Sequence, residues 1–307
     1  MDVTRLPILG VDVGGTKILT GLVDQDGKVL ESRQTPMDRS TMQSTLDSIR
    51  TAVAQFVAQL GPGREFCAIG FGLVGRCDPS KGIWVRASNL PISHPVDLCA
   101  QMEALYHVPA FLDNDVFCAT TAENAFGTGK TCKDFIVINV GTGLSAGIVS
   151  DGRLLRGAGN VAGEIGRTSL GLQDWSQGML EDWCSGGGIY SRYSGTQYRN
   201  TRQIMEAASR DPAAKKLIDE GICALSEAAA ALVTIFNPSA VVLAGSVGIR
   251  PGVCQALRRG IEARSFRAAL PDLKEVRPTQ LPEGTVGLIG AAQNARELLI
   301  KRKYPEI

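Results

Sequence analysis

Ile8-Leu-Gly-Val-Asp-Val-Gly-Gly-Thr-Lys17 is a short apolar run that ends in a glycine turn, and a second apolar run follows at residues 18–23. A dinucleotide-binding or Walker-type loop would lead from a strand into a helix, and neither full pattern is present at this turn. The stretch therefore predicts a strand, a turn and a returning strand. Gly14 and Gly15 lack the side chains that would block a ligand, so consecutive backbone N–H groups can line an anion site.

The same plan recurs 127 residues later, counted from Asp12 to Asn139. An apolar run at 135–140 leads into Gly141-Thr-Gly143 and a second apolar run, and both copies close on an Asp-Gly pair of the kind that favours hairpins. An internal repeat of this length indicates duplicated halves. We expect an α/β fold with duplicated mixed sheets and a central cleft, where the two turns hold one polyphosphate between them.

Length and composition set the broad class. The chain has 307 residues, enough for about two domains. Lys and Arg number 32 against 31 Asp and Glu, so no global field favours nucleic acid or a membrane surface. The eight cysteines form no CxxC pair, and no apolar run of membrane-spanning length or signal-peptide profile is present. We expect reduced thiols, a cytoplasmic location, and neither nucleic acid nor membrane as a partner.

The remaining elements are predicted from periodicity and from breakers such as Asn237-Pro238. Helices are expected at 43–60, 116–125, 214–236 and 289–303, and strands at 66–72 and Ala240–Ala244. Asp115 lies at or near the start of the second of these helices, where the helix dipole favours an ionised carboxylate. Such an Asp suits a general base, and it equally suits a plain helix cap. The two histidines, His94 and His107, offer a poorer base.

Five motifs in order resemble those of the ROK family, which comprises sugar kinases, related repressors and the kinase half of an animal amino-sugar enzyme. They are Asp12-Val-Gly-Gly-Thr-Lys17, Asn114-Asp115, Gly141-Thr-Gly143, Ala162-Gly-Glu-Ile-Gly166, and Asn237-Pro238 with Leu243-Ala-Gly-Ser-Val247. The resemblance covers nearly the whole chain. It implies the two-domain actin-like ATPase (ribonuclease H-like) fold, with one domain at 1–113 plus 290–307 and the other at 114–289.

The resemblance also implies a role for each matching residue. Asp115 would be the catalytic base, and Asp12 would lie near a Mg²⁺ ion, held through water. The nucleotide would contact Gly14, Gly15, Thr16, Lys17, Gly141, Thr142, Gly143, Gly245, Ser246 and Val247 in addition to Asp12. The sugar would contact Gly75, Arg76, Ser88, Asn89, Asn114, Glu164, Arg167 and Glu181 in addition to Asp115.

One departure from the family concerns its structural zinc site. Relatives often carry a His and three Cys there, whereas this chain has Arg167, Leu172, Asp174 and Met179. Because these side chains lack the ligand set that zinc prefers, we expect no structural zinc. Arg167 either braces this region by pairing with a nearby carboxylate or reads an anionic group on the sugar; we favour the brace.

The chemistry of phosphoryl transfer needs positioning and charge stabilisation, so two phosphate turns, a metal and one carboxylate are sufficient parts. The leading hypothesis is an ATP- and Mg²⁺-dependent kinase for a hydroxyl of a hexose or N-acetylhexosamine. Alternatives are a catalytically silent sugar sensor and a kinase using polyphosphate or another nucleotide. A repressor is not expected because only nine residues precede Gly10. The family further implies a homodimer.

Overall fold

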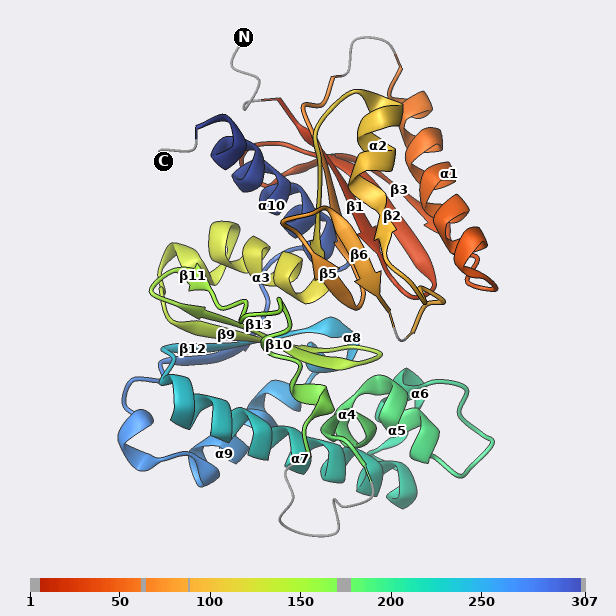
Figure 1. The fold of residues 1–307 in the computed structure, drawn as a ribbon. Helices are drawn as coiled ribbons and strands as arrows, with labels where there is room; N and C mark the ends of the chain where they lie inside the picture. The colour runs from red at the N-terminus through yellow and green to blue at the C-terminus, as the bar shows by residue number, and fades with distance from the viewer. Residues whose placement is uncertain (1–5, 62–64, 88, 170–177, 305–307) are drawn as a thin grey trace. The chain divides into compact units, whose positions relative to one another are not determined.

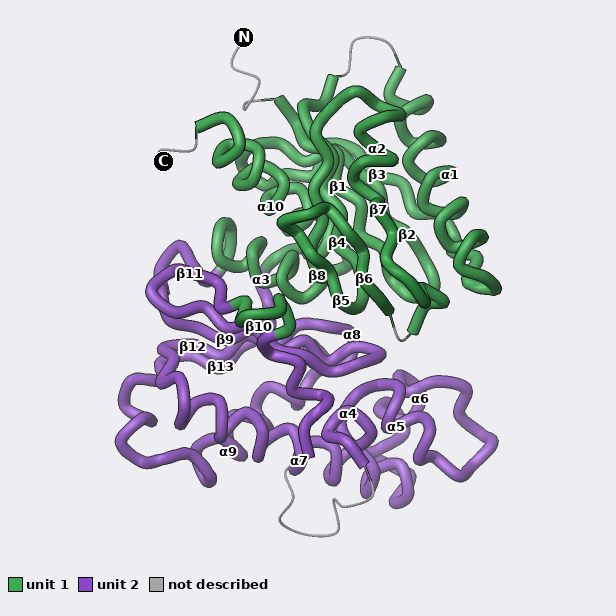
Figure 2. The backbone as a smooth tube through the Cα atoms, in the orientation of Figure 1, with its two compact units in different colours: residues 1–127, 156–161, 281–307 green, residues 128–155, 162–280 purple. Residues whose placement is uncertain are grey.

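The computed structural model describes residues 6–61, 65–87, 89–169 and 178–304, drawn in Figure 1. The chain divides into two compact units, coloured separately in Figure 2. Unit 1 comprises residues 1–127, 156–161 and 281–307, and unit 2 comprises 128–155 and 162–280. This division differs from the expected domain ranges, because the helix after residue 114, the segment 156–161 and residues 281–289 all belong to unit 1.

The sheet of unit 1 has five strands in the order β3-β2-β1-β4-β8. The bounds of its strands are β1 Ile8–Val13, β2 Lys17–Val23, β3 Val29–Pro36, β4 Ile69–Leu73 and β8 Ala110–Asn114. β1, β2 and β3 are antiparallel neighbours, whereas β1, β4 and β8 run parallel. A separate three-stranded sheet is formed by β5 Arg76–Asp78, β6 Ile83–Arg86 and β7 Val96–Asp97.

Helices cover both faces of this first sheet (Figure 1). α1 Met42–Leu60 and α2 Leu98–Tyr106 pack on the face to which Val11 and Val13 contribute core side chains. α10 Val286–Lys303 packs on the opposite face and along α3 Asp115–Phe126. The alternation of side chains along a strand accounts for the two separate apolar clusters.

α10 approaches the sheet closely because glycines lie beneath it. A Cβ atom built on Gly10 would lie 2.7 Å from the carbonyl oxygen of Leu288, and one on Gly70 would collide with the carbonyl oxygen of Ala291. Both approaches would be closer than the contacts that real Cβ atoms make. The glycines of β1 and β4 therefore set the depth of helix packing.

Unit 2 repeats the strand order of unit 1, with β11-β10-β9-β12-β13 as its five-stranded sheet. Its strands are β9 Phe135–Val140, β10 Leu144–Ser150, β11 Arg153–Leu154, β12 Ala240–Ala244 and β13 Glu275–Pro278. Again the first three in the chain pair antiparallel and the later two run parallel to the first. The predicted duplication of mixed sheets is confirmed.

The helices of unit 2 lie mainly on one side of its five-stranded sheet (Figure 1). They are α4 Leu180–Cys184, α5 Gly186–Arg192, α6 Thr201–Ala207, α7 Pro212–Phe236, α8 Gly245–Gly248 and α9 Val253–Arg264. α7 and α9 pack together and contribute Leu225, Leu257 and Ile261 to a core shared with β9 and β12. Short 3-10 turns occur at η2 Thr128–Lys130, η3 Ile165–Arg167 and η5 Arg267–Ala269.

The expected helices and the strand Ala240–Ala244 are all present. α1, α3, α7 and α10 begin within three residues of the predicted starts, and α7 ends where Asn237 adopts φ 45° before Pro238. The strand expected at 66–72 is β4, which begins later, at Ile69. These matches follow from strong periodicity and clear breakers.

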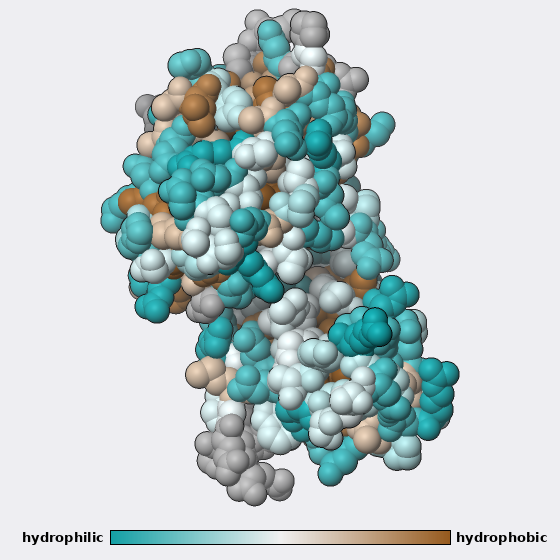
Figure 3. All heavy atoms as spheres, turned by 90° about the vertical axis from the view of Figure 1, so that its right-hand side faces the viewer, coloured by the Kyte–Doolittle hydropathy of each residue, from teal (hydrophilic) through white to brown (hydrophobic). Residues whose placement is uncertain are grey.

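The eight cysteines are free thiols, as expected. Burial raises the pKa of the Cys118 thiol well above its usual value, and the same cause acts on Cys77. No helix in the described part of the chain is long and apolar enough to cross a membrane. On the face drawn in Figure 3, apolar side chains form only small groups among polar ones.

Candidate active site

The predicted site residues of unit 1 follow the carboxyl ends of three parallel strands. In the sheet register, Val13 of β1 lies beside Leu73 of β4, which lies beside Asn114 of β8. The turn at 14–16, the loop at Gly75 and the start of α3 therefore emerge from one edge of the sheet. Open α/β sheets bind ligands at this edge.

The first glycine turn is closed by a hydrogen bond from the Gly14 N–H to the carbonyl oxygen of Lys17, at 3.0 Å. No atom lies within 4 Å of a Cβ built on Gly15, so space is open above this residue. The side chains of Thr16 and Lys17 are exposed. The turn thus presents backbone and one ammonium group to the surroundings, which suits an anionic ligand.

Asp12 precedes this turn and lies beside the first turn of α10. A Cβ atom on Gly287 would come within 2.7 Å of the Asp12 carboxyl carbon. Although part of the Asp12 side chain reaches the surface, burial raises the pKa of its carboxyl to about 6, and the charge of Lys17 opposes that rise. A cation beside Asp12 would favour its ionised form.

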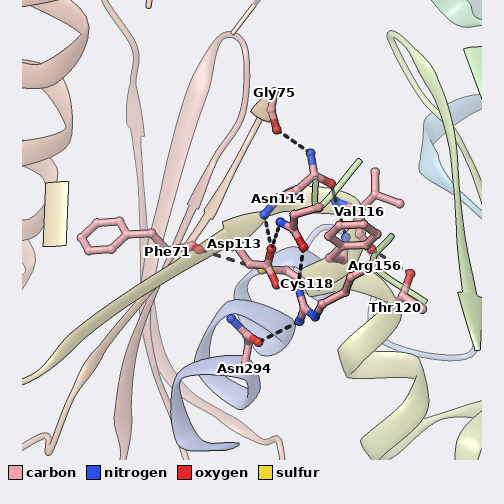
Figure 4. Close-up of polar contacts among 11 residues, drawn as sticks. Phe71, Gly75, Asp113, Asn114, Val116, Cys118, Thr120, Arg156 and Asn294 are labelled. Carbon is pink, nitrogen blue, oxygen red and sulfur yellow. Dashed lines mark hydrogen bonds and ion pairs between the residues drawn. The ribbon is translucent and has the colours of Figure 1, made fainter. Parts of the chain in front are cut away.

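Asp115 is the first residue of α3, as the sequence predicted, and Asn114 is the residue that caps the helix. The Asn114 side-chain oxygen accepts hydrogen bonds from the N–H groups of Val116 at 2.9 Å and Phe117 at 3.4 Å. Its amide nitrogen donates to the carbonyl oxygen of Gly75 at 2.9 Å. Asn114 therefore fixes the start of α3 against the loop between β4 and β5 (Figure 4).

Gly75 occupies a position that only glycine fills readily. Its φ of 91° lies in the left-handed region, and a Cβ atom there would collide with the carbonyl oxygen of Arg86. Arg76, the next residue, is exposed at the start of β5. Asn89 is also exposed, whereas Ser88 lies outside the described residues.

Directly before Asn114, a buried ion pair anchors the segment 156–161. The Asp113 side chain is 0% exposed and pairs with the Arg156 guanidinium. Asp113 also accepts hydrogen bonds from the Asn160 amide at 3.0 Å and from the Asn114 N–H at 2.9 Å. Arg156 in turn reaches Asn294 of α10, as Figure 4 shows. This network was not predicted, because nothing local in the sequence links residues 113 and 156.

In unit 2, the second glycine turn joins β9 to β10. The Gly141 N–H donates to the carbonyl oxygen of Gly143 at 3.0 Å. The N–H groups of Gly186 and Gly187, at the start of α5, donate to the carbonyl oxygens of Gly141 at 2.7 Å and Thr142 at 3.0 Å. The Gly-rich start of α5 thus supports the turn from behind.

Glu181, at the start of α4, contacts both this turn and η3. One carboxylate oxygen accepts a hydrogen bond from the Leu144 N–H at 2.9 Å, and the other lies 3.6 Å from the Arg167 guanidinium. The Arg167 guanidinium also lies 3.9 Å from the Met179 sulfur. The contact between Arg167 and Glu181 is the kind of brace favoured from the sequence.

Glu164 lies one residue before η3. Its side chain reaches the surface, yet the surrounding protein removes enough water to raise the pKa of its carboxyl. The positive charge of Arg167 lowers this pKa, and the negative charge of Glu181 raises it further. The three side chains are therefore electrostatically coupled.

Two of the four positions that would hold zinc in relatives, Leu172 and Asp174, lie outside the described residues, and the other two, Arg167 and Met179, contact each other. Among the residues that the structure describes, no group of three or more His, Cys, Asp or Glu could hold a metal ion. The expectation of a zinc-free site stays a prediction.

A pocket of about 270 Å³ opens beside the second turn, within unit 2. Gly245, Ser246 and Val247 follow β12, which is in register with β9, so they emerge from the same sheet edge as Gly141. The pocket is lined by Gly141, Thr142, Gly186, Asn200, Thr201, Arg202, Met205, Ser246, Val247 and Arg250. The contributions from α6 and from Arg250 were missed, since these residues belong to no motif.

The comparisons with known proteins agree with this architecture. The model of the ROK family matches residues 8–297. The chain belongs to the ROK family. Its fold, two α/β units with mixed sheets, is that of ROK kinases within the actin-like ATPase class.

Among ROK relatives, a glucokinase from Thermotoga maritima is 28% identical over 266 residues, which is 79% of this chain and 83% of that protein. A ROK family glucokinase from Streptomyces griseus, solved in complex with glucose and AMPPNP, is 28% identical with a TM-score of 0.74, covering 95% of this chain and 99% of that one. The DNA-binding transcriptional dual regulator NagC of Escherichia coli is 27% identical over 94% of this chain and 75% of that protein. The ROK family thus offers both kinases and regulators for comparison.

Proposed function

We propose that this protein is an ATP-dependent carbohydrate kinase that phosphorylates a hydroxyl of a hexose or N-acetylhexosamine. The observation that carries the proposal is the junction of β8 and α3, where Asn114 caps the helix and bonds to Gly75 while Asp115 opens it. A carboxylate placed on a rigid helix start, with open glycine turns in both units, supplies the parts that phosphoryl transfer needs. The similarity to glucokinases supports the same enzyme class.

In the proposed reaction, Asp115 accepts the proton of the sugar hydroxyl as that oxygen attacks the γ-phosphate. The phosphates contact the turn of Gly14, Gly15, Thr16 and Lys17 and the turn of Gly141, Thr142 and Gly143, and the nucleoside contacts Gly245, Ser246 and Val247. Phosphoryl transfer requires little covalent chemistry from the protein, so positioning these groups is the main task.

Mg²⁺ is the metal we assign to this reaction. It usually takes one or two carboxylates together with substrate phosphates and water, and the partly buried carboxyl of Asp12 at the phosphate turn fits that pattern. The raised pKa of Asp12 is consistent with a carboxyl group whose ionised form is stabilised when a cation binds beside it. When bound, the ion would neutralise charge on the phosphates.

For the sugar, we propose contacts from Gly75, Arg76, Ser88, Asn89, Asn114, Asp115, Glu164, Arg167 and Glu181. The ion pair with Glu181 supports a bracing role for Arg167, and its half-exposed guanidinium would also meet an anionic substituent. Comparing neutral with acidic sugars separates these two roles. We also propose that the protein acts in the cytoplasm as a homodimer.

The test is ADP release with MgATP across neutral, N-acetylated and acidic sugars, for the wild type and for Asp115→Asn. The variant is expected to lower the turnover rate by about 10²–10⁴-fold, as loss of a general base does. Asp219→Asn, an exposed position on α7 with 59% of its side chain accessible, is the matched control and should retain full rate. Undiminished activity of Asp115→Asn would refute the assigned base.

The second candidate is a sugar sensor without catalysis, which the similarity to NagC favours. A sensor would bind a sugar, measurable by calorimetry, yet release no ADP with any sugar in the panel. Sugar-dependent ADP release excludes this candidate.

A further inference from the structure

The carboxylate of Asp113 is buried and faces hydrogen-bond donors. Its side chain is 0% exposed, and its oxygens accept from the Arg156 guanidinium, from the Asn160 amide at 3.0 Å and from the backbone N–H of Asn114 at 2.9 Å. A carboxylate matches these three donors, whereas an amide would present a donor of its own to one of them. The cluster therefore suits an acidic residue at the end of β8, two residues before Asp115.

Arg156 joins this carboxylate to two helices. Its guanidinium donates to the side-chain oxygens of Asn160 at 3.1 Å and of Asn294, on α10, at 3.4 Å. The guanidinium carbon also lies 5.3 Å from the centre of the Phe117 ring, on α3, which is a cation–π distance. One arginine side chain thus contacts β8, α3 and α10 (Figure 4).

The start of α3 is consequently held on both sides of the proposed base. Before Asp115, the N–H of Asn114 donates to Asp113; after it, the Phe117 ring lies beside the Arg156 guanidinium. A general base acts only within hydrogen-bond reach of the proton that it accepts, and a displacement of about 1 Å can lower the rate by about 10²-fold. The placement of the Asp115 carboxylate therefore depends on the contacts that Arg156 makes.

The same cluster holds one end of the chain that leads to Glu164. The segment 156–161 belongs to unit 1, and Gly163 follows it in unit 2. Asn160 adopts a left-handed φ of 54° and is bonded to Asp113, and the Gly163 carbonyl oxygen accepts a hydrogen bond from β10 at 2.8 Å. Two residues separate these anchors, and Glu164 directly follows the second. Loss of the ion pair would free more of the chain before this proposed sugar contact.

We propose that Asp113 and Arg156 are positioning residues for phosphoryl transfer: their ion pair sets the place of the Asp115 carboxylate and restrains the chain that leads to Glu164. The two side chains act through Asp115 and Glu164 and not on the reacting atoms. This inference rests on the proposed function, in which those two carboxylates contact the sugar. Loss of the pair should change the use of the sugar and leave the use of MgATP unaltered, a pattern that a loss of stability alone would not produce.

The test is steady-state kinetics of Arg156→Met with MgATP and whichever of glucose, N-acetylglucosamine and N-acetylmannosamine the wild type phosphorylates fastest. Each variant is assayed at a temperature at which circular dichroism shows it to be folded. We expect kcat/KM for the sugar to fall by about 10–100-fold through misplacement of the base, while KM for MgATP stays within about twofold. Arg156→Lys restores a positive charge opposite Asp113 without the fork of donors, so its kcat/KM should lie between those of Arg156→Met and the wild type.

Arg296→Met is the matched control, since Arg296 is another arginine of unit 1 with interior contacts. It lies on α10, is 7% exposed and donates to the carbonyl oxygens of Leu6 at 3.2 Å and Val23 at 3.5 Å. Val23 is paired with the first residue of β1, so these contacts lie at the sheet edge opposite the proposed site. The control should also lose stability, yet keep kcat/KM for the sugar within about twofold of the wild type.

Three results would overturn the inference and leave the kinase assignment standing. They are an unchanged kcat/KM in Arg156→Met, equal losses in Arg156→Met and Arg296→Met, and an Arg156→Lys variant no better than Arg156→Met. Absence of wild-type turnover with all three sugars would instead contradict the proposed function, and the inference with it.

Discussion

Substitution of Arg156 by Leu tests how the segment 156–161 is anchored next to the proposed base. The Asp113 side chain is fully buried, and the variant removes its cationic partner while leaving the Asn160 and Asn114 hydrogen bonds in place. Breaking a buried ion pair from one side costs about 3–5 kcal/mol. Because Arg156 is itself 36% exposed and Asp113 keeps two other donors, we expect a loss at the lower end, about 3 kcal/mol.

The loss is measured by urea unfolding followed by circular dichroism, and by the melting temperature, where about 3 kcal/mol corresponds to a decrease of about 6–12 °C for a unit of this size. Asp113→Asn in the Arg156→Leu background removes the unpaired charge and should recover about half of the loss. A decrease below about 1 kcal/mol for Arg156→Leu, or no recovery in the double variant, would refute the electrostatic account of this anchor.

Three further predictions concern the turn, the core and the brace. The pKa of Asp12 is about 6 in the folded protein and 3.8 ordinarily, so the wild type should lose stability as pH rises between those values. In the absence of divalent cations, the melting temperature of Asp12→Asn should therefore exceed that of the wild type by an amount that grows over this pH range. A difference that stays constant with pH would contradict the raised pKa. Gly70→Val should lower the free energy of unfolding by about 3 kcal/mol in urea titrations, because its Cβ would collide with the Ala291 carbonyl of α10; a neutral effect would show that the helix can move away. Arg167→Met should raise the pKa of Glu164 further, seen by NMR titration of the side-chain carboxyl; an unshifted titration would contradict their coupling.

Local features of the chain were predicted because their causes are local. The glycine turns after β1 and β9 have short sequence signatures, and α1 and α7 have apolar residues at helical spacing with clear ends. Asn237 ends α7 with a positive φ of 45°, directly before a proline that cannot continue a helix. In each case neighbouring residues alone determine the structure.

The parts that escaped prediction depend on contacts between distant residues. Asp113 directly precedes the Asn114-Asp115 motif, and nothing local in the sequence indicates a partner for it. Only the fold brings Arg156 to Asp113 and Asn294 to Arg156. Likewise, Arg202 lies on α6 and Arg250 in the turn after α8, and the whole of α7 separates them in the chain. No periodicity links such positions, so the pocket that they line follows from the packing of the fold.

The strand order explains why short local motifs nevertheless indicated a site. The motifs at Asp12, Gly75 and Asn114 lie far apart in the chain, yet β1, β4 and β8 are parallel and in register, so their ends meet at one edge. β9 and β12 do the same for Gly141 and Gly245 in unit 2. A motif that directly follows a buried strand therefore carries positional information when the strands are parallel, and the internal repeat indicates that both sheets share this arrangement. Residues that do not follow a strand, such as Arg202, lack this information, which is why the sequence did not predict their place in the pocket of unit 2.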